Sequence, residues 1–140
     1  MMPLMKIGID IDGTITHAPA FFRLLTAALH GKDDVAIHII TARGGPLCRE
    51  HDQVVVETAE ELAELGIKYD TLACLGPLQK LAYIEQHDID VMFDDTDEEV
   101  IAAPERCTVF KIREDMNFCW DTNRWLHSKQ TSRDITDEQA

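Results

Sequence analysis

The sequence predicts a three-layer α/β/α fold with a five-stranded parallel sheet, and two observations carry this prediction. First, short apolar segments alternate with amphipathic segments five times along the chain. Second, the links between these segments are short, which favours parallel strands joined by helices that cover both faces of the sheet. This arrangement is a Rossmann-like α/β fold. No internal repeat, low-complexity tract or linker interrupts the pattern.

The first strand, the first helix and the second strand are predicted between residues 4 and 41. Residues 4–10 form a short, mostly apolar run without a helical period, as in a buried strand. A helix begins at Pro19 and ends before Gly31, a residue that commonly closes helices. Its apolar face is predicted to hold Phe21, Leu25 and Ala28. The second strand covers residues 35–41.

The middle of the chain continues the alternation. A long helix is predicted from Leu47 to Leu65, with Gly66 closing it. A short third strand lies within residues 67–76, and a further helix begins at Pro77. The apolar face of the long helix is predicted to hold Val55, Ala59, Leu62 and Leu65.

The C-terminal part supplies the last two strands. Residues 89–93 and 108–112 are predicted as the fourth and fifth strands. Between them, residues 96–99 match a capping box that opens a helix. Residues 117–127 are predicted as a last helix, and residues 128–140 as a polar, loose tail.

Length and composition indicate one domain at residues 1–127 followed by the tail at 128–140. The chain has 140 residues, of which 45% are apolar, and a net charge of −13. This charge repels nucleic acid and anionic membranes, so the charge argues against a nucleic-acid partner. The four cysteines lie far apart, which favours neither a zinc site nor a disulfide framework. Without an apolar run long enough for a signal peptide or a membrane span, we expect a cytoplasmic protein with no membrane partner.

Carboxylates follow two of the predicted strands. Asp10 and Asp12 end the first strand, and Asp94 and Asp95 end the fourth, while Thr41 ends the second. Because ligands of open parallel sheets bind beyond the carboxyl ends of the strands, we expect these side chains at one edge. Four carboxylates this close repel one another unless a cation lies between them. Oxygen ligands without cysteine or histidine favour Mg²⁺.

Lys80 is predicted in the first turn of its helix, where a positive charge opposes the helix dipole. Local rules broken in this way often mark functional residues, although a plain surface lysine remains an alternative. One helix and one strand fit between Lys80 and Asp94. Lys80 could therefore lie at the same edge of the sheet as the four aspartates. A metal ion, a lysine, a hydroxyl and two separate carboxylates at one edge suit the transfer of a phosphoryl group. One carboxylate would act as the nucleophile, and the second would act as general acid and base. Arg43, two residues after Thr41, is either a substrate ligand or a surface residue.

Four motifs in this order resemble the haloacid dehalogenase superfamily on its phosphatase branch. The motifs are "DIDGT" at residues 10–14, Thr41 after "IHII", Lys80, and Asp94 with Asp95 after "DVMF". The resemblance implies that Asp10 is the nucleophile and a metal ligand. Asp12 would be the general acid and base, with its main-chain carbonyl on the metal. The resemblance further implies that Thr41 and Lys80 bind the phosphoryl group and that Asp94 and Asp95 hold Mg²⁺.

The resemblance also implies a member without a cap domain, because the intervals between the motifs leave no room for one. "TARG" and the paired aspartates are similar to the deoxyribonucleotidase-like and polynucleotide phosphatase-like branches. The expected function is therefore a magnesium-dependent phosphate monoester hydrolase with a small phosphorylated substrate, such as a nucleotide. A non-catalytic protein that binds phosphate and Mg²⁺, and a phosphotransferase, remain open as alternatives. Capless relatives often borrow a lid from a neighbouring subunit, so a homo-oligomer is also open.

Overall fold

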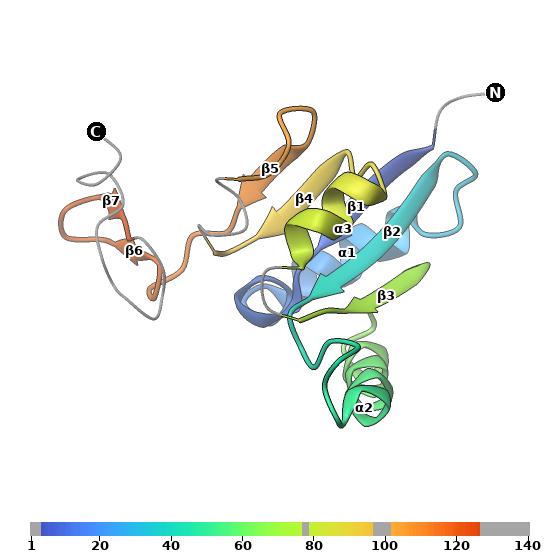
Figure 1. Cartoon of the computed structure of the whole chain (residues 1–140). Coiled ribbons are helices and arrows are strands. Elements are labelled where there is room, and N and C mark those ends of the chain that lie inside the picture. Colours follow the sequence, from blue (N-terminus) through green and yellow to red (C-terminus); the bar gives the residue numbers. More distant parts are fainter. Residues whose placement is uncertain (1–3, 77–78, 97–101, 127–140) are drawn as a thin grey trace.

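A central parallel sheet organises the molecule in the computed structural model, which describes residues 4–76, 79–96 and 102–126. The sheet has five strands in the order β3-β2-β1-β4-β5, and every neighbouring pair is parallel (Figure 1). The predicted three-layer, Rossmann-like α/β/α fold with a five-stranded parallel sheet is therefore confirmed. The strands are β1 (Met5–Ile9), β2 (Val35–Thr41), β3 (Thr71–Cys74), β4 (Val91–Asp94) and β5 (Thr108–Lys111).

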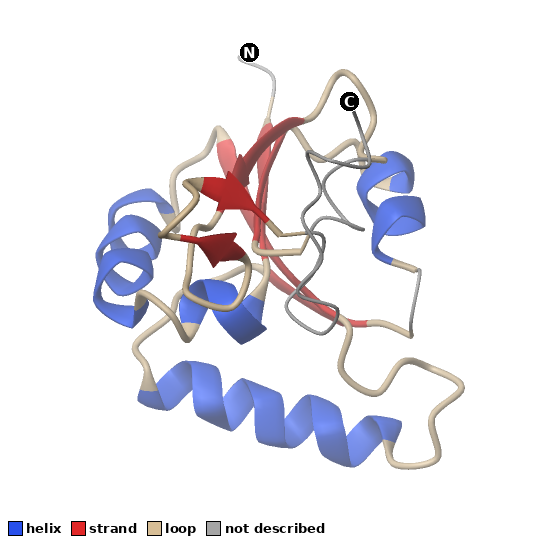
Figure 2. Cartoon of the chain, turned by 90° about the vertical axis from the view of Figure 1, so that its left-hand side faces the viewer, coloured by secondary structure: helices blue, strands red, loops and turns tan. Residues whose placement is uncertain are grey.

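Within the described residues, three α-helices cover the two faces of this sheet (Figure 2). On one face, α1 (Pro19–Leu29) and α2 (His51–Glu64) pack through Phe22 and Leu62 against isoleucines of β1 and β2. On the other face, α3 (Lys80–Gln86) packs through Ile84. The isoleucines on the α1 and α2 side are Ile7, Ile9, Ile37 and Ile39; Ile40 and Met92 lie on the α3 side. The period-2 alternation along β2 thus divides the core into two halves.

Close packing at the centre of the sheet depends on a glycine in β1. A Cβ atom at Gly8 would lie 2.6 Å from Met92 Sδ and 2.8 Å from Ile40 Cδ1. Strands β2 and β4 flank β1 on its two sides, so their side chains fill the space above Gly8. The absence of a side chain lets this layer approach the central strand.

Two predicted helices differ from the structure at their starts or faces. The helix α1 buries Phe22 and Thr26; of the predicted apolar face, Leu25 packs against the core, whereas Phe21 and Ala28 are exposed. The helix α2 begins at His51 rather than at Leu47. Residues 47–50 form turns instead, and the side chain of Leu47 is 96% exposed.

The predicted last helix is wrong. Residues 118–125 form an antiparallel hairpin of β6 (Phe118–Cys119) and β7 (Arg124–Trp125), with Asn123 at a φ of 58° in the connection. Phe118 contacts the rings of Trp120 and Trp125, so the aromatic side chains gather on each other rather than along a helix face. Aromatic residues two positions apart fit the period of a strand.

Three other expectations fall outside the described residues. These are Pro77 as the start of a helix, the capping box beyond Thr96, and the polar tail at 128–140. Within the described part of the chain, no helix combines the length and the apolar character needed to cross a membrane.

Candidate metal centre

Asp10 follows β1 directly and enters a tight turn of residues 11–15. Its backbone N–H donates to the carbonyl of Phe93 in β4 at 3.0 Å, which fixes Asp10 beside the end of that strand. Gly13 takes a φ of 80° within the turn, a conformation that suits glycine. The chain then folds back so that the Thr14 hydroxyl donates to Asp10 Oδ2 at 3.1 Å. The turn thereby buries Asp10 and holds one of its carboxylate oxygens.

Lys80 is the first residue of α3 and points into the same place. Its ammonium donates to Asp10 Oδ1 at 2.6 Å and to Asp94 Oδ2 at 2.9 Å. The lysine side chain is 4% exposed. Burial alone would lower the pKa of Lys80, but the charges of Asp10 and Asp94 outweigh it and raise the pKa above the ordinary lysine value. Lys80 is therefore a permanently charged, buried cation between two carboxylates.

Asp94 and Asp95 lie where β4 ends. Asp94 Oδ1 accepts hydrogen bonds from the backbone N–H and the hydroxyl of Thr96, both at 3.0 Å. The backbone carbonyl of Asp95 accepts from Asn117 Nδ2 at 2.8 Å, which ties this loop to the segment before β6. Both aspartates are buried. Asp94 is thus held at the carboxyl end of the sheet by Thr96 of its own loop and Asp95 by Asn117 of a distant segment.

Asp10, Asp94 and Asp95 form a cluster that fits a hard metal ion. Each carboxylate offers one oxygen, and the three oxygens lie within 4.8 Å of one another. Opposite ligands of Mg²⁺ are about 4.2 Å apart, so small side-chain shifts would close the set around this ion. Lys80 supplies one positive charge to these three carboxylates, and Lys111 acts on Asp94 and Asp95 as a second. The carboxylates therefore outnumber the ammonium groups, and this excess of negative charge favours a cation.

The pKa of Asp10 is raised well above its ordinary value, and burial is the largest cause. The charge of Lys80 lowers this pKa, and the charge of Asp94 raises it. A divalent ion beside Asp10 would favour the charged form of its carboxylate.

Thr41 ends β2 at the same edge of the sheet and is 1% exposed. Its carbonyl accepts from the backbone N–H of Leu75 at 2.8 Å. Among the residues that the structure describes, the Thr41 hydroxyl oxygen has no hydrogen-bond partner. A buried hydroxyl without a partner is costly, so this group suits an oxygen of an incoming ligand.

Asp12 and Arg43 pair with each other beside the cluster. Arg43 Nε donates to Asp12 Oδ2 at 2.9 Å, and Arg43 Nη2 donates to Asp12 Oδ1 at 2.6 Å. Arg43 Nη1 also donates to Glu61 in α2 at 2.5 Å. The Asp12 side chain is 55% exposed, and its carboxylate is not among the three clustered ones. The structure therefore brings Asp10, Lys80, Asp94 and Asp95 together but turns the Asp12 carboxylate toward Arg43.

Sequence reasoning missed two residues that hold the cluster. Thr14 bonds Asp10, and its place within "DIDGT" was a signal that could have found it. Asn117 bonds the loop of Asp95, but it lies in the segment predicted to be helical. Nothing in the sequence around Asn117 indicates this long-range contact.

No family model matches this chain, and neither does any curated protein. Among solved structures, the universal stress protein from Archaeoglobus fulgidus matches with a TM-score of 0.48. The two chains are 14% identical, and the match covers 80% of this chain and 96% of that one.

The expected haloacid dehalogenase assignment is therefore corrected. The matched structure is a universal stress protein, and no family or sequence match supports the dehalogenase superfamily. The hydrolase activity, the aspartyl phosphate on Asp10 and the phosphatase class expected with that superfamily fall with the assignment.

Proposed function

We propose that this protein binds Mg²⁺ through Asp10, Asp94 and Asp95 and, with Lys80, holds the phosphate group of a small ligand. One observation carries the proposal: three buried carboxylates cluster at one place, and two of them contact the buried ammonium of Lys80. The proposal concerns binding and includes no chemical step.

The charge of the cluster supports the metal. An unpaired buried charge costs several kcal/mol, on the order of 3–5 when its partner is missing. Lys80 contacts two of the three carboxylates, and Lys111 acts on Asp94 and Asp95 through its charge, so the carboxylates still outnumber the two ammonium groups. The ligand atoms are oxygens only, which favours a hard ion such as Mg²⁺ over zinc or copper.

The groups around the cluster support the phosphate. Mg²⁺ in proteins is commonly held by one or two carboxylates together with phosphate oxygens of a ligand. Lys80 carries three N–H donors, and it gives two of them to Asp10 and Asp94. The buried Thr41 hydroxyl lies one strand away and lacks a partner among the described residues. A cation, an ammonium and a hydroxyl at one edge form a suitable set for phosphate oxygens.

A second candidate function is a purely structural cation site. The deep burial of all three carboxylates favours it, because a buried ion can stabilise a fold without contacting any ligand. The two functions differ in whether phosphate binds in the presence of the cation.

Calorimetry with Mg²⁺ and inorganic phosphate tests the proposal. The wild-type protein should bind one Mg²⁺, and phosphate should bind to the Mg²⁺-loaded protein at least tenfold more tightly than to the protein in EDTA. Asp95→Asn should weaken Mg²⁺ binding at least tenfold. Asp33→Asn, at an exposed position, is the matched control and should bind like wild type. Mg²⁺ binding without phosphate binding would favour the structural site, and the absence of Mg²⁺ binding would overturn both.

We also propose the cellular compartment and the oligomeric state of the protein. All four cysteines are free thiols, which suits a reducing compartment such as the cytoplasm. Trp120 and Met116 are exposed by more than half, and an apolar area of this kind can pair two copies of a chain. A homo-oligomer therefore remains part of the proposal, and light scattering of the purified protein measures it directly.

A further inference from the structure

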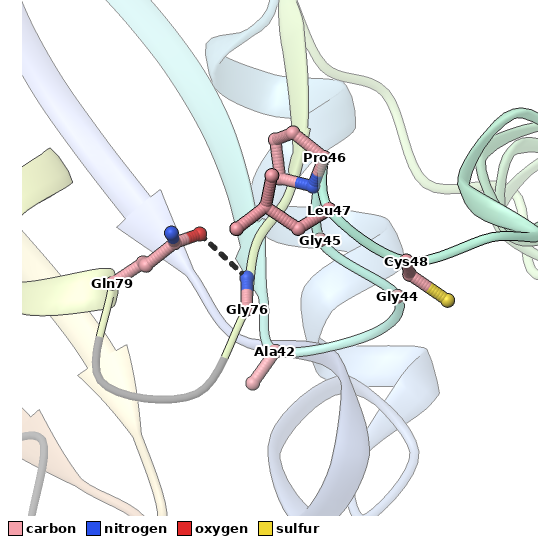
Figure 3. A pocket seen from close by; sticks show the side chains of 8 residues that line it. All are labelled: Ala42, Gly44, Gly45, Pro46, Leu47, Cys48, Gly76 and Gln79. Carbon is pink, nitrogen blue, oxygen red and sulfur yellow. Dashed lines mark hydrogen bonds between the residues drawn. The ribbon is translucent and has the colours of Figure 1, made fainter.

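A cleft of about 530 Å³ opens between two loops at the carboxyl end of the sheet. One loop follows β2, and the other connects β3 to α3 (Figure 3). Figure 3 shows Gln79 on one side of the cleft and Pro46 and Leu47 on the other. The lining residues are Ala42, Gly44, Gly45, Pro46, Leu47, Cys48, Gly76 and Gln79.

The chain itself joins this cleft to the metal centre. Ala42 on one wall directly follows Thr41, and Gln79 on the other wall directly precedes Lys80. The two residues that would contact a bound phosphate are therefore the chain neighbours of two residues that line the cleft. A ligand with its phosphate at Lys80 would extend its remaining atoms toward this cleft.

Among the described residues that line the cleft, none carries a charged side chain. Ala42, Pro46 and Leu47 present apolar side chains, and the glycines expose flat peptide groups. The two loops approach so closely that a Cβ atom at Gly45 would lie 2.1 Å from the backbone nitrogen of Gly76. Such a surface suits an uncharged, flat group better than an ionic one.

One polar group in the cleft has a fixed orientation. Gln79 Oε1 accepts a hydrogen bond from the backbone N–H of Gly76 at 2.7 Å. Because the oxygen is used in this contact, the amide NH₂ of Gln79 is the end available as a donor. The cleft therefore offers one hydrogen-bond donor beside an apolar surface.

We propose that this cleft binds the uncharged aromatic or heteroaromatic ring of a phosphate-bearing ligand whose phosphate lies at Lys80. The inference rests on the proposed function and adds to it the class of ligand. A volume of about 530 Å³ is within the usual range of small-molecule pockets, roughly 300–1,000 Å³. A ring nitrogen or carbonyl of the ligand would accept from the Gln79 amide. Ligands with a second charged group in place of the ring are disfavoured, because the walls offer no counter-charge.

Two phosphonates that differ only in the ring provide the test. Phenylphosphonate and methylphosphonate are titrated into the Mg²⁺-loaded protein by calorimetry, since both carry the same head group and neither is an ester. The phenyl compound should bind at least tenfold more tightly. Ala42→Trp, at an exposed position, should fill the cleft and remove this preference without changing the affinity for methylphosphonate. Leu47→Ala removes part of the apolar wall of the cleft, and the Leu47 side chain is 96% exposed. This variant should reduce the preference for phenylphosphonate over methylphosphonate about threefold or more.

A matched control distinguishes the loss of the cleft in Ala42→Trp from a general effect of a new tryptophan on ligand affinity. Ala27→Trp places the same change on an exposed position of α1 and should leave both affinities unchanged. If methylphosphonate binds and phenylphosphonate binds no more tightly, the ring site is overturned and the proposed function stands. If neither phosphonate binds in the presence of Mg²⁺, both are overturned.

Discussion

Lys80 places its ammonium nitrogen 2.6 Å from Asp10 Oδ1, although the two residues are 70 positions apart in the sequence. The same nitrogen lies 2.9 Å from Asp94 Oδ2, so one lysine bridges the ends of two neighbouring strands, β1 and β4. The lysine reaches this place because α3 begins at the carboxyl edge of the sheet. This bridge gives the metal centre its charge balance, and the predictions below follow from it.

Replacement of Lys80 by methionine should make the protein dependent on a cation for stability. The change keeps much of the side-chain volume but removes the buried ammonium that contacts Asp10 and Asp94. In EDTA, the free energy of unfolding should fall by about 3–5 kcal/mol, the typical loss when one partner of a buried ion pair is removed. Added Mg²⁺ should restore more stability in this variant than in wild type, as measured by urea denaturation.

Lys32→Met is the control for this experiment, because Lys32 is exposed at the end of α1. It should change the free energy of unfolding by less than about 0.5 kcal/mol. A Lys80→Met protein as stable as wild type in EDTA would contradict the charge balance described above.

Asn117→Ala should weaken the metal centre from a distance. Asn117 is buried and donates through Nδ2 to the carbonyls of Asp95 and Ile112 at 2.8 and 2.7 Å. Loss of these donors leaves buried carbonyls unsatisfied and should cost about 1–3 kcal/mol of folding free energy. Because the loop of Asp95 loses its anchor, Mg²⁺ affinity should fall several-fold in the folded variant.

Calorimetry at a temperature where the variant is fully folded separates the two effects. Gln53→Ala, which removes an exposed side-chain hydrogen bond in α2, serves as the control and should leave Mg²⁺ affinity unchanged. Unaltered Mg²⁺ binding in Asn117→Ala would show that the anchor supports the fold but not the metal centre.

His38 should make the protein less stable in mild acid. His38 lies in β2, and its Nδ1 forms a hydrogen bond with the Tyr83 hydroxyl at 2.8 Å. Burial lowers the pKa of His38, and the neighbouring charges of His87 and Lys6 lower it further to a smaller extent. The unfolded chain therefore binds a proton more readily than the folded one near the ordinary pKa of 6.5. Stability should be complete above that pH and should fall as the pH drops through 6.5 toward the lowered pKa.

His38→Gln should flatten this part of the pH profile, measured by urea denaturation between pH 7.5 and 5. Gln53→Ala, which changes no titratable group on the exposed side of α2, is the control and should retain the wild-type slope. A variant at His38 whose stability falls with pH as steeply as in wild type would assign the acid sensitivity to other groups.

The position of the candidate site could be predicted from the sequence because it follows from topology. Asp10 and Asp94 each follow an apolar strand, and parallel strands bring their carboxyl ends to one edge. Lys80 could be placed there too, since a helix that returns to the sheet begins at that edge. The direction of Asp12 could not be predicted, because it depends on the turn at Gly13 and on Arg43, which lies 31 positions away.

The hairpin at the C-terminal end of the described chain was also beyond sequence reasoning. Arg113 lies over the ring of Trp120 at 4.4 Å, and Lys111 lies over the ring of Trp125 at 4.6 Å. These cation–π contacts stabilise two short strands that have little local signal of their own. The family assignment failed for a related reason: single-letter motifs such as Thr41 and Lys80 specify a geometry of the sheet edge, and unrelated chains with this fold can share it.

Anomalous diffraction from crystals soaked in Mn²⁺ tests the central claim most directly, because Mn²⁺ takes the same oxygen ligands as Mg²⁺ and is visible by its scattering. We predict one strong peak within bonding distance of carboxylate oxygens of Asp10, Asp94 and Asp95, and its loss in Asp95→Asn. A wild-type crystal that binds Mn²⁺ only elsewhere, or not at all at millimolar concentration, would contradict the account.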